Sequence, residues 1–360
     1  MNSKKIIFGI IGSGWRAECF LNVAKACPDR FEVCGVVTRS EENKIKIGNK
    51  WNVNVYHTIE ELLEEHKPEF VITAVAKKAG TEVILDLTSK NIPVLAETPP
   101  GNTIEDLIRL HNNINVNSKI QIAEQYHLQP IHASRISLID AKTIGPVQYC
   151  EVSISQGYHS ISLMRKYLGI QFENATIRAY RFKNPVIEGP GRSGPPNKDN
   201  LVENEHTIAI LDFDGKVGCH NFENNQHRSW VRSQNVVIRG TKGEIKNTRV
   251  SYLKDYLTPI EFELKRKSAG EFENLEGYYF KGIIGEGEWL YKNEFMPSRM
   301  SDEEIALGTT IIKMSEYVKT GQSFYSLAEA CQDQYLSLMI EEAIEKDITV
   351  KTKYQKWARL

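Results

Sequence analysis

The sequence lacks a surplus of either charge, and it has no apolar run long enough to cross a membrane. Its 360 residues carry 45 Lys plus Arg against 46 Asp plus Glu, which leaves a net charge of −1. This balance offers neither a basic field for nucleic-acid backbones nor a polybasic segment for anionic lipid. No apolar run reaches the roughly 18 residues of a transmembrane helix. We therefore expect a small-molecule ligand, with neither nucleic acid nor membrane as a partner.

Paired cysteines are also missing. The six cysteines stand singly, without Cys-x-x-Cys or zinc-type spacing, which indicates a reducing compartment and unpaired thiols in the core. Lys4 and Lys5 precede a short apolar run that superficially resembles a signal peptide. That run is six residues long and soon meets Arg16 and Glu18, unlike a secretory signal. The expectation is a cytoplasmic protein.

The length and the 41% hydrophobic content predict two globular domains, which we place at residues 1–125 and 126–360. In the first, short β-rich runs alternate with amphipathic stretches, the pattern of βαβ units. The predicted strands are 6–11, 31–37, 53–56, 70–75, 94–96 and 120–123. They predict a Rossmann-type, doubly wound parallel sheet.

After Pro130 the runs are longer and partly alternating, which is typical of antiparallel strands with one face on a core. They are 147–155, 175–183, 207–213, 218–222 and 236–239, and two closing helices are predicted at 301–320 and 327–346. The Gly- and Pro-rich segment 188–197 is a loop, either a mobile linker or a flap over a substrate cleft. The predicted fold class is α/β, with a C-terminal α+β domain.

A dinucleotide-binding fingerprint follows the first predicted strand and opens the first helix. Its residues are Gly12, Ser13, Gly14, Trp15, Arg16 and Ala17, in the form G-x-G-x-x-A. The first glycine permits the tight turn, the second lets the backbone approach a pyrophosphate, and the alanine keeps helix and strand close. The pyrophosphate would be held at the helix N-terminus.

The end of the second strand distinguishes NADP from NAD. Thr38, Arg39 and Ser40 stand where an Asp or Glu would accept the ribose hydroxyls of NAD, and they suit a 2′-phosphate. NADP is therefore favoured. The alternative is that Arg39 is solvated or stacks on the adenine while Glu41 or Glu42 takes the ribose of NAD.

The order of motifs along nearly the whole chain resembles the glucose-fructose oxidoreductase and inositol dehydrogenase family (Gfo/Idh/MocA). The motifs are 8–17, the Glu97-Thr98-Pro99 version of the family's Glu-Lys-Pro, 123–130 at the domain junction, 156–169 as the active-site helix, and 240–245. The resemblance implies a large, open, mainly antiparallel sheet in the second domain. It also implies a homodimer or homotetramer formed through that sheet, and NAD(P)-dependent chemistry on sugars or polyols.

By the same resemblance, further cofactor contacts come from the ends of later strands. These are Ala74, Val75, Ala76, Glu97, Thr98 and Gln125. Two family residues of the proton relay are replaced here. The Lys of Glu-Lys-Pro is Thr98, and the Asp four residues before the helix histidine is Ser155. Neither side chain is a general base near neutral pH, so the usual relay does not transfer.

His159 is the predicted acid or base, because an imidazole titrates near neutrality; the alternative is a structural histidine at the helix start. Lys77 or Lys78, at the end of the fourth strand, can place an ammonium near the position of the missing Lys, or can simply be solvated. Tyr126 is the third candidate for proton transfer.

A polyhydroxylated or anionic substrate is expected to meet phenol, imidazole and guanidinium groups near this cleft. The candidate substrate contacts are His127, Ser155, Arg165, His227 and Arg228, although Arg165 is as readily a structural ion-pair partner. No metal is predicted, because Glu203 and Glu205 share one face of a strand from which His206 points away.

The leading interpretation is an NAD(P)-dependent oxidoreductase that acts on a sugar-like hydroxyl or carbonyl. The alternative is a nucleotide-binding sugar sensor or regulator of the same family that has lost redox catalysis, for which Thr98 and Ser155 argue.

Overall fold

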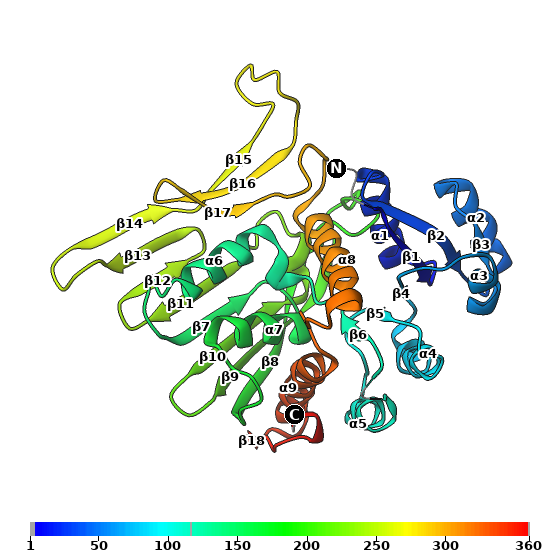
Figure 1. The fold of residues 1–360 in the computed structure, drawn as a ribbon. Helices are drawn as coiled ribbons and strands as arrows, with labels where there is room; N and C mark the ends of the chain where they lie inside the picture. The colour runs from blue at the N-terminus through cyan, green and yellow to red at the C-terminus, as the bar shows by residue number, and fades with distance from the viewer. Residues whose placement is uncertain (1–3, 116, 359–360) are drawn as a thin grey trace.

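Six short strands in the first third of the chain form a parallel sheet of order β3-β2-β1-β4-β5-β6 (Figure 1). The computed structural model describes residues 4–115 and 117–358. The strands are β1 Ile6–Ile11, β2 Phe31–Val37, β3 Val55–Tyr56, β4 Phe70–Thr73, β5 Val94–Ala96 and β6 Ile120–Ile122. The strand order reverses between β1 and β4, and the crevice at such a point, outside the carboxyl ends of the strands, is where open α/β sheets bind ligands.

Five helices connect these strands and cover the sheet: α1 Trp15–Ala26, α2 Glu41–Trp51, α3 Ile59–Glu65, α4 Lys77–Ser89 and α5 Ile104–Asn113. All four residues of β4 are buried, as expected of a parallel strand covered on both faces. The predicted strand 70–75 ends early, at Thr73. Ala74 to Ala76 leave the sheet and lead into α4, whose N-cap is Ala76. The confirmed fold class is therefore α/β with an N-terminal Rossmann sheet.

A nine-stranded sheet follows, of order β14-β13-β12-β11-β7-β10-β9-β8-β18. Its strands are β7 Val147–Ser153, β8 Thr176–Ile187, β9 Leu201–Asp212, β10 Val217–Glu223, β11 Asn235–Gly240, β12 Gly243–Lys246, β13 Arg249–Leu253, β14 Pro259–Glu263 and β18 Val350–Lys351. Only the pairing of β7 with β10 is parallel, so the large, mainly antiparallel sheet is confirmed. A separate three-stranded sheet comprises β15 Lys265–Ser268, β16 Phe280–Gly285 and β17 Glu288–Lys292.

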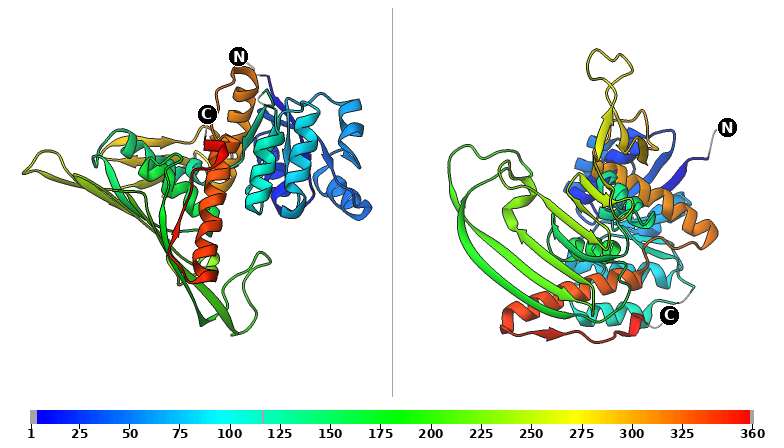
Figure 2. Two further views of the ribbon diagram at one scale, coloured as in Figure 1. Left: turned by 90° about the horizontal axis from the view of Figure 1, so that it is seen from below. Right: turned by 90° about the vertical axis from the view of Figure 1, so that its left-hand side faces the viewer.

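Helices cover one face of the nine-stranded sheet (Figure 2). They include α6 Pro130–Asp140, α7 Gly157–Leu168 and α9 Leu327–Lys346. The short helices η1 Tyr126–Leu128, η2 Asn224–Arg228 and η3 Lys356–Ala358 complete the second part of the chain. Tyr180, Ile208 and Ile210 are exposed apolar side chains of the sheet. Assembly through the open sheet face into a homodimer or homotetramer stays a prediction.

Helix α8, Asp302–Thr320, lies between the two large sheets and next to α1 (Figure 1). Glu303 of this helix accepts a hydrogen bond from Arg16 at 2.6 Å, and Ser315 donates one to Glu69 at 2.6 Å. After α8, the backbone N–H of Tyr325 donates to Gln121 Oε1 of β6 at 2.8 Å. These contacts fix the C-terminal helices against the parallel sheet.

The six cysteines are free thiols, and four of them, Cys27, Cys34, Cys150 and Cys331, are buried. They serve as small apolar core residues, as predicted. Within residues 4–115 and 117–358, no helix combines the length and apolar character needed to span a bilayer.

Candidate active site

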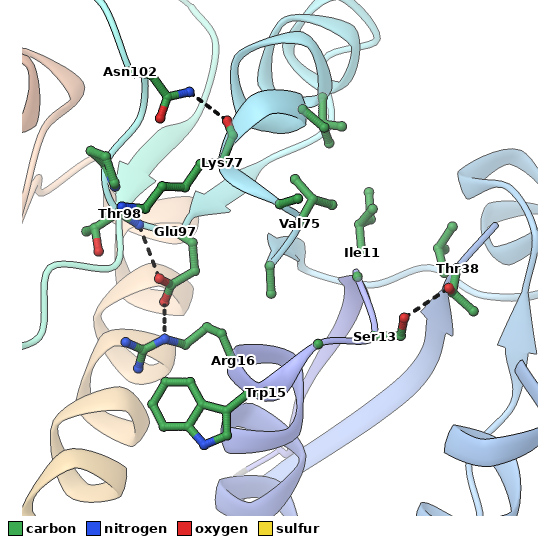
Figure 3. Close-up of a pocket in the computed structure, with 18 of the residues that line it drawn as sticks. Ile11, Ser13, Trp15, Arg16, Thr38, Val75, Lys77, Glu97, Thr98 and Asn102 are labelled. Carbon is green, nitrogen blue, oxygen red and sulfur yellow. Dashed lines mark hydrogen bonds and ion pairs between the residues drawn. The ribbon is translucent and has the colours of Figure 1, made fainter. Parts of the chain in front are cut away.

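A cleft of about 1150 Å³ lies where the carboxyl edge of the parallel sheet meets α7 and α9. The predicted site residues that line it are Gly12, Ser13, Gly14, Trp15, Arg16, Thr38, Arg39, Ser40, Ala74, Val75, Ala76, Lys77, Glu97, Thr98 and His159. They come from the ends of four parallel strands and from the first turn of α7. Figure 3 shows the part formed by the parallel sheet and the first turn of α1.

The nucleotide loop has the geometry that a pyrophosphate needs. Gly12 has φ +121°, and a Cβ there would collide with the carbonyl of Ala74. Gly14 is the N-cap of α1 and provides no capping side chain, while the space in front of its Cα is open to 4 Å. The first-turn N–H groups of α1 are therefore left to an anion in the cleft. These residues fit a dinucleotide.

At the adenosine end of the cleft, two of the three predicted hydroxyl and guanidinium groups are already engaged. Ser13 and Thr38 share a hydroxyl–hydroxyl hydrogen bond of 3.0 Å, and Ser40 caps α2 by accepting the N–H of Asn43 at 3.3 Å. Arg39 is exposed and has no ion-pair partner within the described part of the chain. Its guanidinium is available to a ligand.

At the same end of the cleft, Glu41 is one of the two carboxylates that could accept the ribose hydroxyls of NAD, and it already has a partner. Glu41 Oε2 lies 3.0 Å from Nε2 of His57, which itself lines the cleft. An engaged carboxylate is a weaker acceptor for the ribose hydroxyls that define NAD.

The loop 188–197 approaches the nucleotide loop from the second domain. Arg192 lines the cleft, and its guanidinium carbon lies 4.4 Å from the centroid of the Trp15 ring. Arg16 contacts the same ring at 4.9 Å. Of the two interpretations of this loop, a cover over the cleft fits these contacts, because an unattached linker would not stack on the cofactor loop.

The end of β5 carries a partly buried ion pair. Glu97 Oε1 lies 3.3 Å from Nε of Arg16, and the backbone N–H of Thr98 donates to Glu97 Oε2 at 3.2 Å (Figure 3). Burial raises the pKa of Glu97, and the positive charge of Arg16 opposes that shift. The Thr98–Pro99 peptide is cis.

Lys77 begins α4, is exposed, and extends toward Thr98 (Figure 3). An ammonium from the start of α4 thus approaches the position that the missing family Lys would occupy. Lys78 is also exposed but does not line the cleft. Of the two lysines, the geometry therefore favours Lys77.

His159 is held by a carboxylate that the sequence analysis missed. Its Nδ1 lies 2.7 Å from Oε2 of Glu124, whose side chain is fully buried. With Nδ1 engaged, Nε2 is the nitrogen left for a substrate. The one signal in the sequence is that Glu124 follows β6 directly, at the sheet edge where ligands bind.

Tyr126 stacks on the His159 ring with centroids 4.6 Å apart and does not line the cleft. Burial raises the pKa of the Tyr126 phenol, so near neutral pH it is a hydrogen-bond donor and not a base. Of the three candidates for proton transfer, the structure thus places His159 and Lys77 in the cleft and Tyr126 behind His159.

Four other predicted contacts lie outside the cleft lining. Gln125 and Ser155 are buried and His127 is half-buried, and desolvation lowers the pKa of His127 to about 3. Arg165 binds Asp333 at 2.5 Å and donates to backbone carbonyls, and only 4% of it is exposed. The structure therefore corrects the prediction for Arg165, which is a buried ion-pair partner because a guanidinium is buried only with such partners.

His227 and Arg228 belong to η2 and also stay outside the cleft lining. His227 packs edge-on against Phe222, 5.0 Å between centroids. Its pKa is lowered by desolvation first and then by the charges of Arg228 and His159. Neither predicted substrate contact therefore reaches the cleft lining.

Residues 6–125 match the GFO_IDH_MocA family model, described as an oxidoreductase family with an NAD-binding Rossmann fold. The match covers the parallel-sheet part of the chain, which is similar to the NAD-binding domain of this family. The motif resemblance found in the sequence is thus confirmed. No curated protein sequence matches the chain.

Solved structures match the chain over almost its whole length. A levoglucosan dehydrogenase in complex with NADH and levoglucosan is 16% identical, with a TM-score of 0.69 over 97% of this chain and 99% of that chain. A myo-inositol dehydrogenase from Corynebacterium glutamicum is 14% identical, with a TM-score of 0.65 over 97% and 99%. A scyllo-inositol dehydrogenase from Lactobacillus casei is 16% identical, with a TM-score of 0.65 over 98% and 99%. At these identities the likeness concerns the fold.

Proposed function

We propose that the protein is an NAD(P)-dependent oxidoreductase that transfers a hydride to or from a sugar-like or polyol carbon. The observation that carries this proposal is that His159, with Nδ1 bound to a carboxylate, lines the same cleft as an intact dinucleotide loop. The solved levoglucosan and inositol dehydrogenases of the same fold support the substrate class.

In the oxidation direction, a bound nicotinamide would accept the hydride of a carbinol carbon. The hydroxyl proton of that carbinol must then go to a base, and Nε2 of His159 takes it; in reduction the imidazolium returns it. Lys77 supports the developing charge on the substrate oxygen from the side of Thr98.

NADP is the proposed cofactor, because Arg39, which has no ion-pair partner among the described residues, lies where the 2′-phosphate would bind, and because Glu41 is engaged with His57. NAD is the alternative, and it is the cofactor bound, as NADH, in the solved levoglucosan dehydrogenase. A division near residue 125, a cytoplasmic location and a homodimer or homotetramer complete the proposal.

The test is a titration with NADPH and NADH followed by cofactor fluorescence, and then a panel of sugars, polyols and sugar acids assayed by the absorbance of reduced nicotinamide. We expect binding, turnover on a member of the panel, and loss of turnover in His159→Asn. His206→Asn is the matched control, because His206 binds Asn221 on the second sheet and lies outside the cleft. Absence of binding would refute the proposal; tight binding without turnover would favour the sensor.

A further inference from the structure

We infer that Glu124 is a positioning residue that replaces the missing Asp of the family relay, reaching His159 from the end of a different strand. It holds Nδ1–H of His159, so that Nε2 faces the substrate hydroxyl. This inference rests on the proposed function, and it assigns a role to a residue for which the family resemblance supplied none.

The carboxylate of Glu124 is fixed at both oxygens. Oε2 lies 2.7 Å from Nδ1 of His159, and Oε1 accepts the backbone N–H of Tyr126 at 3.1 Å. The Glu124 side chain has no exposed area, so water does not compete for either oxygen. A carboxylate accepts hydrogen bonds only, and Nδ1 must therefore carry the proton. The neutral imidazole is left with its lone pair on Nε2.

The imidazole ring itself is clamped between two tyrosines. Tyr126 stacks on it at 4.6 Å with 29° between the planes, and Tyr158 meets it edge-on at 5.2 Å. A ring flip that exchanged Nδ1 and Nε2 would have to break the stack and leave the buried carboxylate without its donor, which is costly. The pair is therefore preorganised for proton transfer at one nitrogen.

Other charged and titratable groups also face this pair. The groups that interact electrostatically with Glu124 or His159 are Glu97, Tyr126, Tyr158, His227, Tyr325 and Asp333. Arg16 and Glu303 lie further out and pair with each other. Arg16 balances Glu97, and Arg165 balances Asp333. Glu124 has His159 as its one ion-pair partner among the described residues. The imidazolium that forms when the substrate proton arrives is thus stabilised chiefly by Glu124.

The proposed proton transfer and hydride transfer balance in protons and electrons. The O–H bond of the carbinol would break, its proton would form a bond with Nε2, and its electron pair would become the second C–O bond. The C–H bonding pair would leave with the hydride, for which a bound dinucleotide would supply the acceptor. The Nδ1 proton stays on His159, and Glu124 stays a carboxylate throughout, as the orienting carboxylate does in a Ser-His-Asp triad.

The first test needs no turnover. Nitrogen-15 NMR of histidine-labelled protein reports which ring nitrogen of His159 carries the proton, with His159→Asn used to assign the signal. We expect the Nδ1–H tautomer in the wild-type protein and a loss or mixing of that tautomer in Glu124→Gln. The Nε2–H tautomer in the wild-type protein would overturn the inference, even if Glu124→Gln fails to fold.

The second test is kinetic. Glu124→Gln should lower kcat by roughly 10²- to 10⁴-fold, with little change in KM, and should alter the pH profile of kcat. Glu124→Asp keeps the charge and should restore part of the activity. The control is Glu223→Gln, a buried carboxylate outside the cleft that binds Asn204 and Arg232, and it should leave the pH profile unchanged.

The two proposals fail in different ways. An unchanged tautomer together with an unchanged pH profile in Glu124→Gln would refute the role of Glu124 while leaving the oxidoreductase proposal intact. The expected tautomer change, in a wild-type protein that turns over no member of the panel, would support the His159–Glu124 pair and refute the proposed function.

Discussion

Gly14→Ala should weaken cofactor binding while leaving the stability of the fold almost unchanged. Gly14 has φ −83° and ψ −178°, a conformation open to alanine, and an added Cβ would meet no atom within 4 Å. Alanine is a poorer N-cap than glycine by up to about 1 kcal/mol. It also restricts the unfolded chain, which returns about 0.4–1 kcal/mol. We therefore expect the free energy of unfolding to change by less than about 1 kcal/mol.

Cofactor binding should respond very differently, because the new methyl group stands where the backbone would approach a pyrophosphate. Losing one charge-assisted hydrogen bond costs about 1.5–3 kcal/mol, which corresponds to a roughly 10- to 150-fold larger dissociation constant for NADPH. The assays are a fluorescence titration with NADPH and urea unfolding of the same preparation. Retained stability with clearly weakened NADPH binding is the expected result.

Two other glycines provide the controls. Gly80 of α4 also has open space around it and does not line the cleft, so Gly80→Ala should leave NADPH affinity unchanged. Gly12→Ala should instead destabilise the protein, because φ +121° and the Ala74 carbonyl both oppose a side chain. If Gly14→Ala binds NADPH as tightly as the wild-type protein does, the pyrophosphate is not held at this loop.

Three further changes test other parts of the site. Arg39→Ala should weaken NADPH far more than NADH in the fluorescence titration, and an equal loss would refute the 2′-phosphate role. Lys77→Met should lower kcat while Lys78→Met should not, and equal effects would remove Lys77 from the mechanism. His127 is kept neutral by burial, with a pKa of about 3 against 6.5 when unfolded, so the unfolded chain binds the extra proton as pH falls below 6.5. Between pH 7 and pH 5, the free energy of unfolding of the wild-type protein should therefore fall by about 2 kcal/mol more than that of His127→Phe. An equal fall in the two proteins would show that folding does not hold His127 in its neutral form.

Buried parallel strands were the most predictable part of the fold. Ile6–Ile11, Phe31–Val37 and Val94–Ala96 have the predicted bounds, because strands covered on both faces are continuous apolar runs. The long hairpin strand Thr176–Ile187 was predicted four residues too short at its end, since its outer half carries polar and exposed side chains. Lys265–Ser268 was missed altogether because it is a charged strand of a small sheet.

In the site, too, some features could be predicted from the sequence and others could not. The nucleotide loop is local in sequence, so spacing alone predicts its geometry. The contact between Glu124 and His159 joins positions 35 apart, and that between Arg165 and Asp333 joins positions 168 apart. No local pattern encodes such pairs. Only the three-dimensional fold shows that a buried carboxylate contacts His159 and that Arg165 is paired with Asp333 in the core.

A crystal structure of the protein with NADPH bound tests the central claim most directly. The account predicts the pyrophosphate at the first turn of α1 and the 2′-phosphate at Arg39. It predicts the nicotinamide ring beside Thr98, with room for one carbinol group between C4 and Nε2 of His159. A nicotinamide ring placed away from His159, or a cleft that leaves no space between C4 and that nitrogen, would contradict it.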